Sequence, residues 1–255
     1  MVRDGEIHIK NPEEIALMRE AGRLNAMALS AVRGLLQPGV TTADLNAAAE
    51  EVLRKRGAYS PFKNYGHPPF PASICTSLNE QLVHGIPGKR KLQEGDIISI
   101  DCGTVLEGFV GDSAFTAGVG EVSPTARKLI EVTEQALKVG IAMMRVGNKT
   151  GDVSAAIQQF VEGSGFNVVR EYTGHGVGRS MHEGPQVPNY GRPGTGVPLR
   201  PGMTIALEPM VLVGASRTRV LSDQWTVVSA DGSLTAHQEH SVAVTEGDPL
   251  VLTVP

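Results

Sequence analysis

Apolar residues recur at the spacing of an α-helix in four stretches of the chain. The first stretch follows Asn11-Pro12-Glu13-Glu14, which places a capping residue, a proline and two acidic residues where a helix begins. The pattern predicts helices over Ile15–Leu36, from about Thr42 to Gly57, from Ser123-Pro124 to about Met144, and from about Thr150 to just before Gly163.

Between and after these helix pairs lie shorter runs of apolar and β-branched residues, bounded by turn-forming residues. The strands predicted from these runs are Ile97–Asp101, Phe109–Ala117, Met203–Val213, Trp225–Ser229 and Leu234–Val244. Two helix pairs, each followed by strands, indicate an α+β fold.

The two halves of the chain share an internal repeat. Residues 39–48 match residues 147–156 at an offset of 108, and residues 92–101 match residues 199–208 at an offset of 107. Caps and strand-start glycines can recur by chance, but the repeat also pairs Asp101 with Glu208 and His84 with His182. We therefore expect one domain over residues 1–255, with pseudo-twofold halves of about 10–120 and 121–247. In this fold the strands form an antiparallel sheet and the helix pairs pack on one face.

Two aspartates lie on the strands that flank Glu107-Gly108. A two-residue turn there pairs Gly103 with Asp112, which makes Asp112 the diagonal neighbour of Asp101 on the same face. Adjacent carboxylates repel unless a proton or a cation lies between them. A single Asp in such a place is more often a turn or capping residue, so the pair alone leaves both readings open.

Three more acidic or imidazole side chains strengthen the metal interpretation. His175 lies in the glycine-rich run 174–178, Glu208 matches Asp101 through the repeat, and Glu239 lies in a strand that otherwise becomes apolar. Each has a structural alternative, in a turn or on an exposed face. Together, four carboxylates and one imidazole suit Mn²⁺, Fe²⁺, Co²⁺ or Zn²⁺. Two divalent ions would offset the four negative charges in full, so we expect two metal ions.

Composition narrows the function classes. The chain has 255 residues, 41% hydrophobic and 20% charged, with a net charge of −4, which is ordinary for a globular protein and gives no reason to expect nucleic-acid binding. The N-terminal residues are charged, unlike a secretion signal, and no apolar run approaches the ~20 residues of a membrane span. The two cysteines, Cys75 and Cys102, do not suggest a disulfide framework, so we expect a cytoplasmic protein with no membrane contact.

The sequence resembles the type I methionine aminopeptidases in their short bacterial form, which have the pita-bread fold. The resemblance runs from about Ile9 to Val244 and is carried by six ordered motifs. These are Leu82-Val83-His84-Gly85-Ile86-Pro87, Ile100-Asp101 with Gly111-Asp112-Ser113, Thr173-Gly174-His175-Gly176-Val177-Gly178, His182-Glu183-Gly184-Pro185-Gln186-Val187, Leu207-Glu208-Pro209-Met210, and Gln238-Glu239-His240-Ser241.

The resemblance implies a role for each candidate metal ligand. Asp101 would bind one metal through both oxygens, Asp112 and Glu239 would bridge both metals, and His175 and Glu208 would complete the other shell. A hydroxide between the ions would attack the first peptide bond, with Glu208 handling the proton.

Two histidines and an apolar pocket complete the implied site. His182 would donate to the carbonyl oxygen as its charge develops, and His84 would contact the substrate backbone. Without the repeat and the resemblance, both histidines would more often be buried, hydrogen-bonded core residues. By similarity, the pocket for the methionine side chain is formed by Phe70, Cys75, Met181 and Trp225, with His67 near its rim.

The resemblance implies removal of the N-terminal methionine from nascent chains near the ribosome, with a small second residue preferred. We expect a monomer that does not bind nucleic acid directly. One rival is a proline-specific aminopeptidase or dipeptidase of the same fold, but those relatives carry a large extra N-terminal domain. The type II enzymes carry a long insertion, which this chain lacks. The other rival is a binding module without metal ligands, which the complete ligand set opposes.

Overall fold

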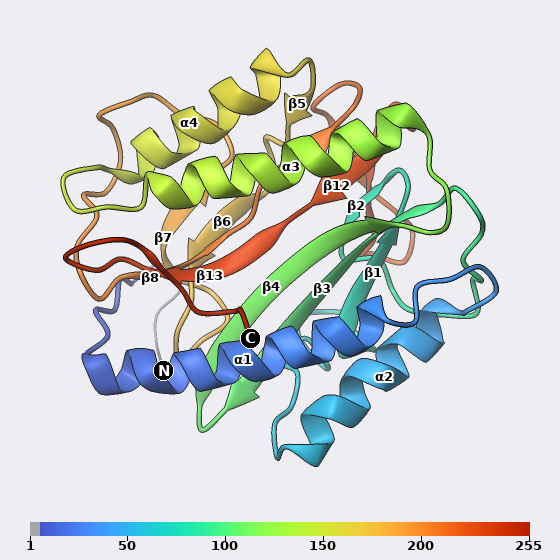
Figure 1. The fold of residues 1–255 in the computed structure, drawn as a ribbon, viewed down its shortest axis with the longest axis horizontal. Helices are drawn as coiled ribbons and strands as arrows, with labels where there is room; N and C mark the ends of the chain where they lie inside the picture. The colour runs from blue at the N-terminus through green and yellow to red at the C-terminus, as the bar shows by residue number, and fades with distance from the viewer. Residues whose placement is uncertain (1–5) are drawn as a thin grey trace.

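Within residues 6–255, four helices pack against one face of a curved antiparallel sheet (Figure 1). The computed structural model describes residues 6–255, so the charged N-terminal stretch at residues 1–5 lies outside the described residues. The helices are α1 (Pro12–Arg33), α2 (Thr42–Lys55), α3 (Pro124–Ala142) and α4 (Thr150–Gly163). All four predicted helices are confirmed. The first three end two or three residues earlier than predicted, and the fourth includes Gly163.

The strands form one eight-stranded sheet and two three-stranded sheets. They are β1 (Ile74–Leu78), β2 (Gln81–Val83), β3 (Ile97–Leu106), β4 (Phe109–Gly118), β5 (Asn167–Val168), β6 (Thr173–Gly176), β7 (Glu183–Pro188), β8 (Thr204–Leu207), β9 (Met210–Leu212), β10 (Thr218–Val220), β11 (Val227–Ser229), β12 (Thr235–His237), β13 (Glu239–Ala243) and β14 (Leu250–Val251). The large sheet has the order β1-β3-β4-β13-β8-β6-β7, with β14 paired to β13. The small sheets are β10-β11-β2 and β12-β9-β5. This architecture confirms the predicted pita-bread class.

Two predicted long strands are each divided in the structure. The run 203–213 forms β8 in the large sheet and β9 in a small sheet, with a break at Glu208-Pro209. Pro209 has no N–H to donate to a ladder, and the Asn189 side chain spans the break by donating to the Glu208 carbonyl (3.1 Å) and accepting from the Met210 N–H (3.2 Å). The run 234–244 divides in the same way at Gln238, into β12 and β13. Both long strands therefore change sheet next to a candidate ligand.

The β3–β4 hairpin has the predicted turn. Glu107 and Gly108 both have positive φ, 50° and 79°, as a two-residue type I′ turn requires. The register pairs Gly103 with Asp112 and Asp101 with Ala114. Asp101 and Asp112 are therefore diagonal neighbours on one face, as predicted.

The two halves repeat each other in detail. Both α2 and α4 have 14 residues and begin at the matched threonines. At the start of the following strand, the Gly95 N–H donates to the Val119 carbonyl at 2.9 Å, and the Gly202 N–H donates to the Val244 carbonyl at 3.0 Å. The sequence repeat therefore corresponds to two structural units with the same internal hydrogen bonds.

The helices cover two hydrophobic clusters, one in each half. In the first half, Leu24 and Ala28 of α1 pack with Ile98, Ile100 and Cys102 of β3. Because side chains alternate along a strand, the residues between these on β3, including Asp101, face away from the helices. None of the helices in residues 6–255 combines the length and hydropathy that crossing a bilayer requires.

Candidate metal centre

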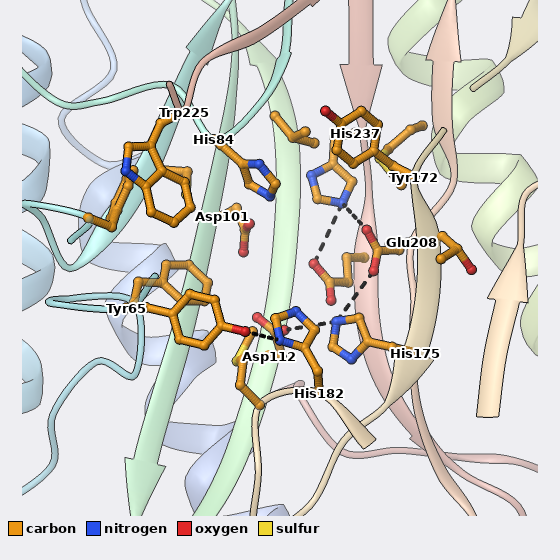
Figure 2. Close-up of a pocket in the computed structure, with 18 of the residues that line it drawn as sticks. Tyr65, His84, Asp101, Asp112, Tyr172, His175, His182, Glu208, Trp225 and His237 are labelled. Atoms are coloured by element: carbon orange, nitrogen blue, oxygen red, sulfur yellow. Dashed lines mark hydrogen bonds and ion pairs between the residues drawn. The ribbon is translucent and has the colours of Figure 1, made fainter. Parts of the chain in front are cut away.

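The predicted ligands converge on a cavity of about 450 Å³ at the face of the sheet away from the helices (Figure 2). All five line it: Asp101, Asp112, His175, Glu208 and Glu239. They come from β3, β4, β6, the end of β8 and β13, which are neighbours in the large sheet. The sheet order therefore brings together residues that lie far apart in the sequence.

Three carboxylates are positioned by the register of adjacent strands. Ala114 of β4 pairs with Asp101 of β3 on one side and with Glu239 of β13 on the other. Asp112 lies two residues before Ala114 and therefore points to the same face. Ala114 is buried, and Asp101, Asp112 and Glu239 lie around it on the same face of the sheet.

His175 and Glu208 approach from the second half. His175 Nε2 lies 3.5 Å from Glu208 Oε1 and 4.0 Å from Asp112 Oδ2. His175 Nδ1 lies 2.9 Å from the Gly176 carbonyl oxygen, to which it donates a hydrogen bond. This bond fixes the tautomer, so the lone pair of Nε2 faces the carboxylates, as a metal-ligating imidazole requires.

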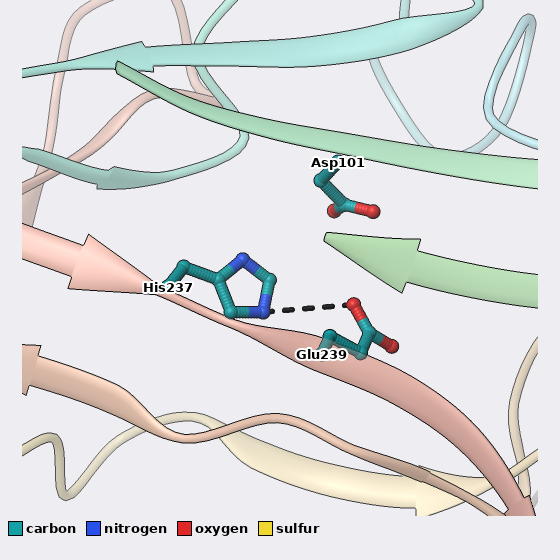
Figure 3. A group of neighbouring side chains, drawn as sticks. All are labelled: Asp101, His237 and Glu239. Atoms are coloured by element: carbon teal, nitrogen blue, oxygen red, sulfur yellow. Dashed lines mark ion pairs between the residues drawn. The ribbon is translucent and has the colours of Figure 1, made fainter. Parts of the chain in front are cut away.

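Two groups of donor atoms have the proximity that a cation needs. Asp101, His237 and Glu239 form one group (Figure 3), and Asp112, His175 and Glu239 form the other, with all donor atoms of a group within 4.8 Å of one another. Oδ1 of Asp101, Oδ1 of Asp112 and Oε1 of Glu239 are buried and have no hydrogen-bond partner. Buried carboxylate oxygens are normally paired or bound to a cation, so the residues fit divalent metal ions.

The electrostatics of the cluster favour added positive charge. Burial raises the pKa of Asp101 to about 7. Burial, and then the charge of Asp101, raise the pKa of Asp112 well above its ordinary value. Burial, and then neighbouring carboxylates, do the same for Glu208 and Glu239. Burial lowers the pKa of His175 to about 3, which keeps its imidazole neutral. Carboxylates crowded in this way are stabilised by cations.

His237 was not among the ligands predicted from the sequence. Its Nε2 lies 3.5 Å from Glu239 Oε2 and 3.9 Å from Glu208 Oε2, and neither ring nitrogen has a hydrogen-bond partner. Burial lowers its pKa to about 3. The available signal was the spacing, because His237 and Glu239 are two residues apart in the run 234–244, and side chains two apart share a face on a continuous strand.

The two predicted catalytic histidines line the same cavity (Figure 2). His182 Nδ1 lies 3.0 Å from the Tyr65 hydroxyl, and its ring centroid lies 4.4 Å from that of His175. His84 adopts a positive φ of 59° and packs edge-on against Tyr172 and Trp225. Burial lowers the pKa of His84 to about 4. The structure therefore places both histidines beside the candidate metal ligands.

An apolar pocket adjoins the carboxylates. Phe62, Phe70 and Cys75 are buried there and pack against Met181 and Trp225, and all five line the cavity. The rings of Phe70 and Trp225 meet edge to face at 5.2 Å, and the Trp225 indole N–H donates to the Pro68 carbonyl at 2.9 Å. These contacts fix one wall of the pocket.

His67 was predicted near the rim of the pocket, and this stays a prediction. Its side chain is exposed and does not line the cavity. Residues 63–69 form an exposed turn that directs Tyr65, rather than His67, to the cavity and to His182. Tyr65, Phe62 and Tyr172 were not predicted, because aromatic residues in irregular segments carry no periodic signal.

Known proteins are similar to this chain in sequence and have the same architecture. Residues 16–246 match metallopeptidase family M24. The chain is 51% identical to a methionine aminopeptidase of Clostridium acetobutylicum, over 97% of this chain and 99% of that protein. A solved methionine aminopeptidase from Thermotoga maritima is 47% identical with a TM-score of 0.95, covering 98% of this chain and 100% of that one. A prolidase from Pyrococcus furiosus, at 20% identity and a TM-score of 0.78 over 97% of this chain and 65% of its own, shares the fold. This chain therefore belongs to metallopeptidase family M24 and, within it, to the methionine aminopeptidases.

Proposed function

We propose that this protein removes the N-terminal methionine from nascent proteins and peptides and prefers a small second residue. The observation that carries the proposal is the convergence of four carboxylates and His175 in a cavity that continues into an apolar pocket. The cavity volume of about 450 Å³ suits a small peptide end.

We propose that two divalent ions, of Co, Mn, Fe or Zn, are held by Asp101, Asp112, His175, Glu208 and Glu239. Glu239 belongs to both donor groups, which supports a bridging role. When bound, such ions supply Lewis-acid activation of a water nucleophile and of the scissile carbonyl.

The protein's own side chains position the substrate and handle its protons. His182 is oriented by Tyr65 and faces the cavity, from which it can donate to the carbonyl oxygen as negative charge develops. His84 lines the same cavity, from which it can contact the substrate backbone. Glu208 accepts and returns the proton of the attacking water, because its carboxylate lines the cavity beside His175.

Substrate selection comes from the apolar pocket. The pocket excludes water, and its aromatic rings can contact the thioether sulfur of a methionine side chain. It is formed by Phe62, Phe70, Cys75, Met181 and Trp225. A charged or branched first side chain would lose solvation or overfill this space. The pocket therefore favours the long, flexible methionine side chain.

The proposed function also implies where in the cell the protein acts. The substrates are the N-termini of nascent chains, which are exposed where ribosomes release them. We accordingly assign the protein to the cytoplasm, as a monomer that binds neither nucleic acid directly nor membrane.

Cleavage of Met-Ala-Ser by protein reloaded with Mn²⁺ or Co²⁺ tests the proposed function. We expect release of methionine, no cleavage of a Xaa-Pro dipeptide, and loss of activity with a chelator. Glu131→Gln, at an exposed position of α3, serves as a matched control for Glu239→Gln. Cleavage of the Xaa-Pro dipeptide instead would assign the chain a dipeptidase activity. An inert protein that binds no metal would make it a binding module.

A further inference from the structure

His237 occupies in the second half the position that Asp112 occupies in the first. In the first half, Gly103 pairs with Asp112, and Asp101 lies two residues before Gly103. In the second half, Met210 pairs with His237, and Glu208 lies two residues before Met210. The repeat that matches Asp101 with Glu208 therefore also matches Asp112 with His237.

The hydrogen bonds that hold these two positions are the same. The Ser241 hydroxyl accepts from the Asp112 N–H at 3.0 Å and donates to the Asp112 carbonyl at 2.9 Å. The Thr116 hydroxyl accepts from the His237 N–H at 2.9 Å and donates to the His237 carbonyl at 2.8 Å. Each half thus uses a hydroxyl of its partner half to fix one backbone position at the cavity.

The side chain of His237 is buried and lies close to two candidate metal ligands. It is 2% exposed, and Nε2 lies 3.5 Å from Glu239 Oε2 in the group that also contains Asp101 (Figure 3). Two ligand atoms of one ion, each about 2.1 Å from it, lie at most about 4.2 Å apart. The distance from Nε2 to Glu239 Oε2, 3.5 Å, falls within that limit.

We propose that His237 is a further metal-ligating residue, whose Nε2 binds the ion on the Asp101 side of the centre. The proposal rests on the metal centre proposed above. Each half would then contribute an equivalent pair of ligands, Asp101 with Asp112 and Glu208 with His237. Each ion would then have one imidazole ligand, His237 on the Asp101 side and His175 on the other side.

X-ray absorption of the Co²⁺-loaded protein tests this assignment, because imidazole rings give a distinct outer-shell scattering pattern. We expect two imidazoles per pair of ions in the natural protein and one in His237→Gln. The matched control is His240→Gln, which removes a histidine of β13 whose Nδ1 bonds Thr253 rather than the centre. That control should retain the natural imidazole count.

Calorimetric titration of the metal-free protein gives a second readout. We expect His237→Gln to weaken one binding step at least about 10-fold, since even residues behind the ligands contribute 10- to 100-fold. An imidazole count or an affinity equal to that of the natural protein would overturn the proposal. If His237→Gln does not fold, a single imidazole per two ions in the natural protein overturns it equally. Binding of only one ion contradicts the two-ion centre, and the difference between natural and variant imidazole counts then still decides the role of His237.

Discussion

Ser241 holds Asp112 in place through two backbone hydrogen bonds, accepting from its N–H at 3.0 Å and donating to its carbonyl at 2.9 Å. Ser241 is completely buried, and the bonds join β13 to β4 where both strands carry candidate ligands. A single hydroxyl therefore fixes the backbone beneath a carboxylate that the sequence places in the opposite half of the protein.

Ser241→Ala should destabilise the protein by about 1–3 kcal/mol, because it leaves a buried N–H and a buried carbonyl of Asp112 without partners. Urea denaturation measures the change in the free energy of unfolding. Ser30→Ala, at an exposed position of α1, is the control and should change it by less than about 0.5 kcal/mol. Equal midpoints for the two variants would contradict the role given to Ser241.

Asp112→Asn and Glu239→Gln should each reduce turnover of Met-Ala-Ser at least about 100-fold, because each removes a charged ligand while keeping the side-chain volume. Metal content, measured by elemental analysis, should fall with it. Near-normal turnover in either variant would count against the two-ion centre.

His182→Ala should lower kcat about 100- to 1,000-fold, the cost of losing one donor to a developing oxyanion. Metal content should stay at the natural level, because His182 belongs to neither donor group. Tyr65→Phe removes the hydroxyl that lies 3.0 Å from His182 Nδ1, and it should give a smaller loss of kcat. Loss of metal from His182→Ala would show that His182 is itself a ligand.

Much of this site could be predicted from the sequence because its carboxylates sit on regular strands. A two-residue turn and strand alternation were enough to place Asp112 beside Asp101, and the repeat placed Glu208 opposite. His237 was missed because the strand that carries it divides at Gln238 and its equivalence to Asp112 depends on the register with β9. Tyr65 was not predicted, because the direction of side chains in an irregular turn depends on tertiary contacts.

Removal of the metal should make stability fall as pH rises above about 6.5. Burial raises the pKa of Asp101 from 3.8 to about 7, so between these two pH values the folded state holds a proton that the unfolded state has lost. The carboxyls of Asp112, Glu208 and Glu239 have raised pKa values for the same reason. Each such group lowers stability by up to about 1.4 kcal/mol per pH unit until its folded pKa is passed.

Below about pH 6.5 buried histidines oppose this trend. Burial lowers the pKa of four of them, His84, His175, His237 and His240, so their unfolded forms take up protons and stability rises with pH there. Urea denaturation with a chelator from pH 6.5 to 8 should therefore show a falling midpoint, and added Mn²⁺ should reverse it. A midpoint that stays level without metal would contradict the protonation scheme.

A buried ion pair supports the turn that carries His182. Lys10 and Glu183 form this pair, and Glu183 Oε1 also accepts from the N–H groups of Arg179 (2.9 Å) and Ser180 (3.2 Å). Glu183→Gln should cost about 3–5 kcal/mol of stability, because it leaves the buried charge of Lys10 uncompensated. It should also lower kcat by displacing His182.

A double-mutant cycle measures how much the interaction between Lys10 and Glu183 itself contributes to stability. Lys10→Met combined with Glu183→Gln should be less destabilising than the sum of the single changes, because no buried charge is left alone. The exposed pair Lys55–Glu51, at 2.7 Å, is the control, and Lys55→Met should change stability by less than about 1 kcal/mol. Additive effects in the Lys10–Glu183 cycle would mean that the two side chains act independently. The turn before β7 would then be held by the Arg179 and Ser180 backbone bonds to Glu183 alone, and Lys10→Met would leave kcat unchanged.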